Sequence, residues 1–240
     1  MTNNIKDLSI KKTARIAGVL YFLFLILGIF CFFYVPSQIL VDGNASATAS
    51  NIMANGLLFR LGIAANIISQ VIFIFLVLVL YELFKNVDKK YAKLMVNLVF
   101  ISIPIAFLII LVQAAPLILL SGASFLKVFS PEQLDALVML FLNVYNYGII
   151  MIEVFWGLWL YPFGYLVFKS GFIPKTIGVF LIIGGFCFLI NSFSFLLIPG
   201  YHDIISSIIA LPKAIGELSI IFWLLIKGVK DQTQSKTLTK

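Results

Sequence analysis

The sequence predicts an all-α protein, a polytopic six-helix transmembrane bundle with both termini in the cytoplasm. Three observations predict this class. Hydrophobic residues make up 62% of the chain and charged residues 11%, whereas a soluble domain has roughly 45–50% and 25%. The mean hydropathy is +1.10. Apolar runs long enough to cross a bilayer recur along the chain, and lysines gather between alternate runs. We therefore expect nearly the whole chain to be embedded in the lipid bilayer.

Six apolar segments are predicted to be membrane-spanning helices, because in hydrocarbon each backbone N–H and C=O group must be paired within its own segment. A β-barrel would need strands of about ten alternating residues, and these runs are longer and apolar throughout. The predicted organisation is a cytoplasmic segment (1–16), a membrane domain (17–226) and a cytoplasmic tail (227–240). The helices are expected at 17–35, 57–84, 94–120, 137–168, 176–198 and 204–226. The fourth is long enough to begin outside the hydrocarbon core or to kink near Pro162.

The basic residues predict the orientation. Fourteen of the seventeen Lys and Arg residues fall on one side of six alternating crossings. The positive-inside rule places that side, with both termini, in the cytoplasm. The three others are Arg60, Lys127 and Lys213. The first apolar run exceeds the 7–15 residues of a signal-peptide core, so we expect a retained helix and not a cleaved signal.

The longest outer connection, 36–56, is small and polar. Asn44 or Ser46 is expected to cap a short helix that runs through Asn51 and Met53, because both residue types favour the N-cap position. This helix is predicted to lie along the membrane surface.

Four charged residues are predicted within or beside the membrane. Counting 1.5 Å per residue from the flanking lysines places Glu217 roughly 15 Å deep, Lys213 roughly 21 Å deep and Glu153 roughly 24 Å deep. Arg60 is expected near the outer boundary. A charge at the bilayer centre costs roughly 2.5–3.5 kcal/mol on insertion scales. We therefore expect these side chains to face the interior of the bundle and to converge in its outer half.

Small and polar residues predict which helix faces pack together. The fourth helix carries such a stripe at spacings of three and four: Asn143, Asn146, Ile150, Glu153, Gly157, Leu160 and Gly164. The second and fifth helices carry shorter ones: Gly62, Asn66, Ser69 and Gln70, and Gly178, Gly185 and Ser192. The predicted intramembrane polar site comprises Arg60, Asn66, Gln70, Asn146, Glu153, Lys213 and Glu217.

Three interpretations of this site are open. Glu153 and Glu217 bind a cation, a proton or a polar ligand in an outward-opening cavity, with Arg60 or Lys213 as the counter-charge. Alternatively, Arg60 or Lys213 pairs with one of the glutamates and only fixes the helix register. In the third interpretation an unpaired glutamate stays protonated and neutral.

Other classes of site are not indicated. The net charge of +7 does not predict nucleic-acid binding, because the lysines form short clusters between apolar runs and not one basic face. Cys31 and Cys187 lie inside apolar runs and are expected to be packing residues. His202 is the single histidine, so a multi-histidine metal site is excluded, and no metal or cofactor is expected.

Five stretches together resemble the bacterial membrane family named domain of unknown function 4386. They are ARIAGVLYF (14–22), ATASNIMANGLLFRLGI (47–63), LYELFKNVDKK (80–90), EVFWGLWLYPFGYLVFKSGFIPKTIGV (153–179) and IGELSIIFWLLIKGVK (215–230). The resemblance covers about residues 10–230. It implies a six-helix protein of a bacterial cytoplasmic membrane and implies no activity. Arg60, Glu153 and Glu217 lie inside these stretches.

The leading functional prediction is a multi-pass membrane protein that binds a small molecule, an ion or a lipid, as a transporter-like protein, a sensor or an accessory subunit. The main alternative is a membrane enzyme that acts on a lipid or isoprenoid substrate, with Glu153 as acid or base. It ranks lower because the sequence shows no metal-ligand cluster, nucleophile constellation or phosphate-binding loop. A third prediction is a structural partner of another membrane protein.

Overall fold

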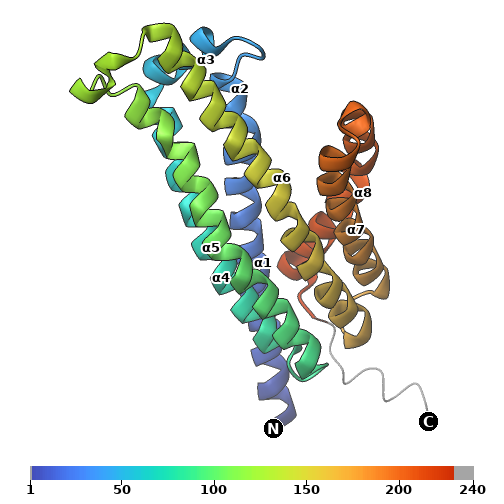
Figure 1. The fold of residues 1–240 in the computed structure, drawn as a ribbon. Helices are drawn as coiled ribbons and strands as arrows, with labels where there is room; N and C mark the ends of the chain where they lie inside the picture. The colour runs from blue at the N-terminus through green and yellow to red at the C-terminus, as the bar shows by residue number, and fades with distance from the viewer. Residues whose placement is uncertain (1, 230–240) are drawn as a thin grey trace. The chain divides into compact units, whose positions relative to one another are not determined.

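The computed structural model describes residues 2–229, with side chains from residue 10 onward. All of its regular structure is helical (Figure 1). The helices are α1 (Thr2–Ile29), α2 (Val35–Ile39), α3 (Ala45–Ala54), α4 (Gly56–Phe84), α5 (Lys89–Leu119), α6 (Pro131–Ser170), α7 (Lys175–Leu197) and α8 (His202–Phe222). Short turns of 3₁₀ or π type complete them: η1 (Phe30–Tyr34), η2 (Ser124–Val128), η3 (Pro199–Tyr201) and η4 (Trp223–Lys227).

Six helical stretches in the described chain are long and apolar enough to cross a membrane. They are Ile10–Ile39, Gly56–Phe84, Lys89–Leu119, Pro131–Ser170, Lys175–Leu197 and Pro199–Lys227. The predicted class, an all-helical protein with six candidate crossings, is therefore confirmed. Helix α6 continues through Pro162 for 40 residues.

A proline explains the wide turn between α1 and α2. Pro36 has no N–H group to donate to the carbonyl four residues earlier, which disturbs the α-helical ladder. The chain makes a π-turn at η1, where the Val35 N–H bonds to the Phe30 carbonyl. Single π-turns of this kind occur within otherwise α-helical segments.

Helix α3 begins as the sequence predicts. The Asn44 side chain accepts a hydrogen bond from the Ala47 N–H at 2.9 Å, which confirms Asn44 as the N-cap. The Asn51 amide donates to the Ile39 carbonyl at 3.1 Å and so ties α3 to the end of α2.

The chain divides into two compact units. The first unit comprises Met1–Phe22, Ile72–Ser102 and Ile152–Lys240. It contains α7 and α8 together with parts of α1, α4, α5 and α6. The second unit comprises Leu23–Val71 and Ile103–Met151 and contains α2, α3 and the other parts of the same four helices.

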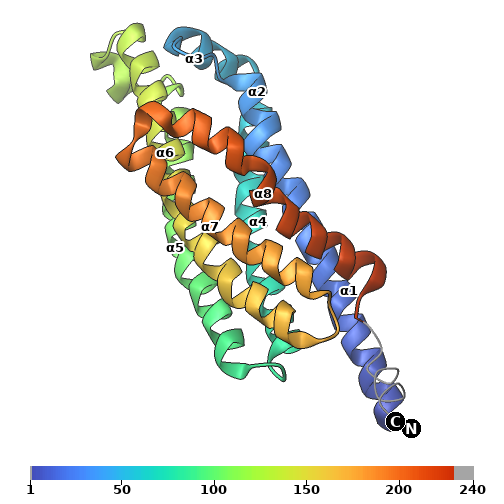
Figure 2. The ribbon, with the colours of Figure 1, turned by 90° about the vertical axis from the view of Figure 1, so that its right-hand side faces the viewer.

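Glycines set the helix contacts of the first unit. A Cβ atom on Gly157 of α6 would lie 2.6 Å from the Gly185 carbonyl oxygen of α7. One on Gly164 would lie 2.6 Å from the Gly178 carbonyl oxygen. Helices α7 and α8 run side by side (Figure 2), and a Cβ on Gly216 of α8 would lie 2.7 Å from the Phe180 carbonyl oxygen. The glycines of the stripes predicted on the fourth and fifth helices thus lie where α6 and α7 touch.

The second unit has its own apolar core. Its buried members come from the α1–α2 end, from α3, and from the starts of α4 and α6: Val35, Ile39, Ala49, Ile52, Phe59 and Val138.

Asp88 caps the N-terminus of α5 in the first unit. Its Oδ1 atom accepts hydrogen bonds from the backbone N–H groups of Lys90 at 3.1 Å and Tyr91 at 3.3 Å. Its Oδ2 atom accepts one from the Lys169 ammonium at 3.3 Å. The hydrogen bond from Tyr91, followed by the interaction with Lys169, lowers the pKa of Asp88 from its usual 3.8.

Asp88→Ala is expected to lower the melting temperature (Tm) in detergent, and Asp88→Asn to lower it less, because asparagine also caps helices. Since the folded-state pKa lies below the unfolded one, the stabilisation by Asp88 is complete above the unfolded value and is lost as the pH falls through the lowered folded value. Tm profiles from about pH 6 to about pH 3 for the parent and Asp88→Asn measure this. A difference between the two that does not shrink toward the acid end would contradict it.

Candidate functional site

The predicted charges Glu153, Lys213 and Glu217 belong to the first unit. The Lys213 ammonium lies 2.7 Å from Glu153 Oε1, with the side chains 23% and 10% exposed. The Asn191 amide of α7 donates to Glu153 Oε2 at 2.7 Å. Of the pairings that the sequence leaves open, the structure contains the one between Lys213 and Glu153.

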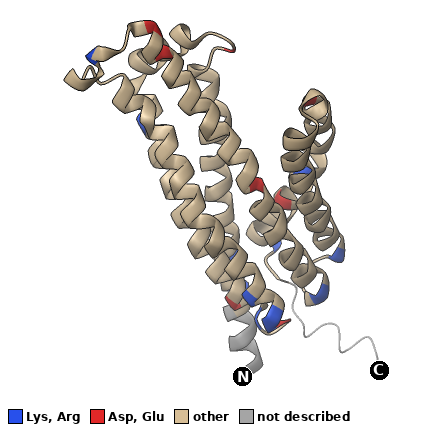
Figure 3. Cartoon of the chain, in the orientation of Figure 1, with Lys and Arg blue, Asp and Glu red and all other residues tan. Residues whose placement is uncertain are grey.

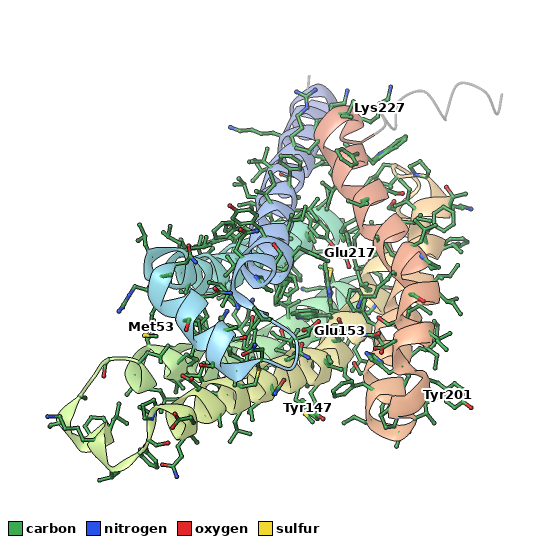
Figure 4. The ribbon with its side chains drawn as sticks, turned by 90° about the horizontal axis from the view of Figure 1, so that it is seen from above. Met53, Tyr147, Glu153, Tyr201, Glu217 and Lys227 are labelled. Carbon is green, nitrogen blue, oxygen red and sulfur yellow. The ribbon has the colours of Figure 1, made fainter. Side chains whose placement is uncertain are left out.

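Glu217 lies four residues after Lys213 on α8 and has a different partner. Its Oε2 atom accepts a hydrogen bond from the Tyr21 hydroxyl at 2.8 Å. Tyr21 is 1% exposed, and its ring lies 6.2 Å from that of Trp159. Glu217 also interacts electrostatically with Lys213 and Glu153. In Figure 4 Glu153 and Glu217 lie among the helices, whereas Tyr201 and Lys227 lie near the two ends of the helical stretch Pro199–Lys227.

We call Tyr21, Glu153, Asn191, Lys213 and Glu217 the charged cluster. Four helices supply it: α1, α6, α7 and α8. It holds two carboxyl groups against one ammonium group. The ammonium also lies 4.3 Å from the centre of the Phe188 ring, a cation–π contact.

One polar atom of the charged cluster has no hydrogen-bond partner within the described residues. Asn191 is 6% exposed, and its amide oxygen is buried without a donor. The amide cannot simply be turned over, because its oxygen would then face the Glu153 carboxylate. A buried polar atom of this kind calls for an explanation, such as a ligand.

The other predicted site residues, Arg60, Asn66, Gln70 and Asn146, belong to the second unit. Asn66 is buried, and its amide donates to Gln113 Oε1 at 3.3 Å and to the Tyr145 hydroxyl oxygen at 3.1 Å. The Gln70 amide donates to the Ser69 hydroxyl at 3.4 Å. The Arg60 side chain is exposed. The predicted site therefore consists of two groups of residues, one in each unit.

Beside this network the second unit contains a cavity of about 570 Å³. Its polar lining residues are Asp42, Gln113, Asn143, Tyr145 and Asn146. The apolar lining includes Phe32, Val35, Ile39, Phe59, Met139 and Leu142. Small-molecule sites typically have volumes of about 300–1,000 Å³ and combine apolar walls with a few convergent polar groups.

Sequence reasoning missed several of these residues. Asn191 is the one Asn or Gln residue of the fifth predicted helix, 176–198. It lies seven residues, about two helical turns, after Gly184. That spacing could have placed it on the packed face of α7. Tyr21 carries no such signal, since tyrosine is ordinary in an apolar helix. Tyr145 and Gln113 are recognised only through their shared partner, Asn66.

Six apolar helical spans with polar groups buried among them define a polytopic helical membrane protein. The chain belongs to the family described as domain of unknown function (DUF4386), whose sequence model matches residues 16–228. The resemblance seen in the sequence is thereby confirmed. An uncharacterized protein of Archaeoglobus fulgidus is 35% identical over 77 residues, which are 32% of this chain and 44% of that protein. The match thus spans less than half of the relative. No solved structure matches the chain.

Proposed function

We propose that the protein binds an amphipathic small molecule with an uncharged polar head in the cavity of the second unit. The observation that carries this proposal is the pairing of a cavity of about 570 Å³ with an ordered polar wall. The volume suits a molecule of a few hundred daltons, and the apolar lining suits one that enters from the membrane.

The hydrogen bonds of the polar wall support an uncharged polar head group on the ligand. Asn66 donates to both Gln113 and Tyr145, which leaves the Tyr145 O–H and the Gln113 NH₂ groups to donate to a ligand. Asn143 and Asn146 add amides that both donate and accept. No Lys or Arg residue lines the cavity within the described chain. A hydroxyl, amide or sugar head therefore fits this wall better than a phosphate or a carboxylate does.

The site acts within a bacterial cytoplasmic membrane, with both termini on the cytoplasmic side, in a transporter-like, sensory or accessory role. The distribution of charge in the first unit supports this orientation. Lysines gather where α4 meets α5 and where α6 meets α7 (Figure 3). Such clusters in short loops mark the cytoplasmic side.

A matched pair of tryptophan substitutions on α6 tests the cavity. Leu142 lines the cavity, whereas Leu140 is 54% exposed and does not. Leu142→Trp is expected to fill the cavity and to remove the bound molecule, while Leu140→Trp keeps it. Native mass spectrometry of the full chain released from mild detergent measures the ligand as extra mass above 26.8 kDa.

The proposal is wrong if the parent protein carries no small molecule, or if Leu142→Trp and Leu140→Trp retain it equally. A chemically altered lipid in place of a bound ligand would favour the membrane enzyme. A reproducible second chain would favour the structural partner.

A further inference from the structure

We propose that a groove on α1 binds one anionic phospholipid, with the lipid phosphate at its basic end and an acyl chain along its apolar end. The residues that line this groove, which we call the basic groove, are Lys11, Lys12, Arg15, Ile16, Val19 and Leu20. The basic groove belongs to the first unit and shares no residue with the ligand cavity of the second unit. The inference therefore goes beyond the proposed function.

The packing of α1 leaves the basic groove open. The packed face consists of residues spaced by three and four: Ala14, Ala17, Gly18 and Tyr21. The two alanines and the tyrosine are at most 1% exposed, and a Cβ on Gly18 would lie 2.7 Å from the Leu225 backbone nitrogen. With about 3.6 residues in a turn, the lining residues of the basic groove fall on the rest of the helix surface. Ile16 and Val19 are accordingly 43% and 50% exposed.

Along the helix axis the basic groove changes from charged to apolar. Its three cationic residues come first, at positions 11 to 15, and its three apolar residues follow, at positions 16 to 20. At 1.5 Å per residue the whole groove is about 14 Å long. A phospholipid in a bilayer has the same order, with a phosphate at the surface and acyl chains below it. The apolar residues lie within the candidate membrane crossing Ile10–Ile39, whereas a free phosphate would use the charged end alone.

The cations of the basic groove favour a lipid with a net negative charge. Among the described residues Lys12 and Arg15 form no ion pair, although both side chains are exposed. Lysines elsewhere in the first unit do have acidic partners: Lys85 with Glu82, and Lys169 with Asp88. A guanidinium group binds a phosphate through two parallel hydrogen bonds, and a nearby ammonium adds a point charge. A zwitterionic head group would bring its own cation to the same place.

A fourth basic residue comes from the other end of the chain. A Cβ on Gly228 would lie 3.9 Å from the Lys11 carbonyl oxygen, which places Lys227 beside α1 at the charged end of the basic groove (Figure 4). In sequence, the stretches 1–20 and 222–240 contain eight Lys and Arg residues and two acidic ones, Asp7 and Asp231. The side chains of these two acids lie outside the described residues. Basic clusters of this kind next to a membrane helix attract anionic lipids.

The test is a titration of the full chain in mild detergent with phosphatidylglycerol or with phosphatidylcholine of the same acyl chains. Native mass spectrometry counts the lipids that are bound. We expect the first phosphatidylglycerol to bind at least about tenfold more tightly than the first phosphatidylcholine, because each basic residue contributes about fivefold. Glycerol 3-phosphate at millimolar concentration should not displace the lipid, because it lacks the acyl chains.

Two double variants locate the site. Lys12→Gln with Arg15→Gln is expected to weaken phosphatidylglycerol binding by about 20-fold and to leave phosphatidylcholine binding unchanged. Lys90→Gln with Lys93→Gln is the matched control, since it removes the same charge, at the same spacing of three, from exposed positions at the start of α5. It should weaken binding less than about threefold. Leu142→Trp should have no effect, because Leu142 lines the other cavity.

Three outcomes overturn the inference. Equal affinities of the parent for the two lipids would show that the head group is not recognised. Equal losses in the two double variants would show a general attraction between charges and not a site on α1. Displacement by glycerol 3-phosphate would identify a free phosphate as the ligand. The first and third measurements use the parent protein, so they decide the matter even if a variant misfolds.

Discussion

Glu153→Gln is expected to lower the free energy of unfolding by about 3 kcal/mol. The substitution leaves the Lys213 ammonium without its carboxylate, and breaking a buried ion pair on one side costs about 3–5 kcal/mol. The lower end applies because Lys213 keeps 23% of its side chain exposed. The glutamine side chain still offers a carbonyl oxygen to the Asn191 NH₂ group. Most of the lost stability therefore comes from the broken ion pair.

A double-mutant cycle separates the pair from its surroundings. Lys213→Met is combined with Glu153→Gln, and unfolding is followed in detergent or nanodiscs. The double variant should recover part of the stability, with a coupling energy above about 1 kcal/mol. The exposed pair Glu82–Lys85 is the control, since such pairs contribute little. Additive losses in the Glu153–Lys213 cycle would show that the two residues do not act as a pair.

Gly164→Ala is expected to destabilise the first unit by about 2–3 kcal/mol, near the upper end for overpacking a tight contact. The added Cβ would lie 2.6 Å from the Gly178 carbonyl oxygen and 2.7 Å from the Ile182 Cγ1 atom. The first of these neighbours is backbone, so α6 and α7 would have to move apart.

Gly28→Ala in α1 is the matched control. Its nearest neighbour would be the Phe32 ring at 3.9 Å, so the usual preference of helices for alanine over glycine predicts a gain of up to about 1 kcal/mol. Unfolding of both variants in detergent measures the contrast. A Gly164→Ala protein that is as stable as the parent, or that gains stability as Gly28→Ala does, would contradict the close approach of α6 and α7.

Much of the fold follows from the sequence because the membrane restricts what a chain can do. A long apolar run has to form a helix there, so six spans can be counted from the sequence alone. The start of α3 could also be predicted, because the Asn44 cap involves two residues only three positions apart in the sequence. The stripe of Gly157 and Gly164 was readable because small residues at seven-residue spacing share one helix face.

The charged cluster could be predicted only in part. The spacing of four between Lys213 and Glu217 places both on one face of α8, and their depth marks them as unusual. Which of them meets Glu153 depends on how α6 and α8 are rotated, and a single sequence does not contain that information. Arg60 and Lys213 were therefore equal candidates, and the structure pairs Glu153 with Lys213.

The cavity was beyond sequence reasoning. Its lining comes from stretches between Cys31 and Ile149 that lie far apart along the chain. Asn66 and Asn146 were expected to join the glutamates because all are polar and intramembrane. In the structure Asn66 donates to Gln113 and Tyr145, and Asn146 lines the cavity with these two residues.

Site-specific photo-crosslinking in growing cells tests the binding of an amphipathic molecule most directly. A photoreactive amino acid is placed at Met139, which lines the cavity, or at the next residue, Leu140, which is exposed. Irradiation followed by mass spectrometry of the peptide should show one discrete adduct of a few hundred daltons at position 139 and not at position 140. The same phospholipid adducts at both positions would show that the cavity holds only bulk lipid, and the proposed function would be wrong.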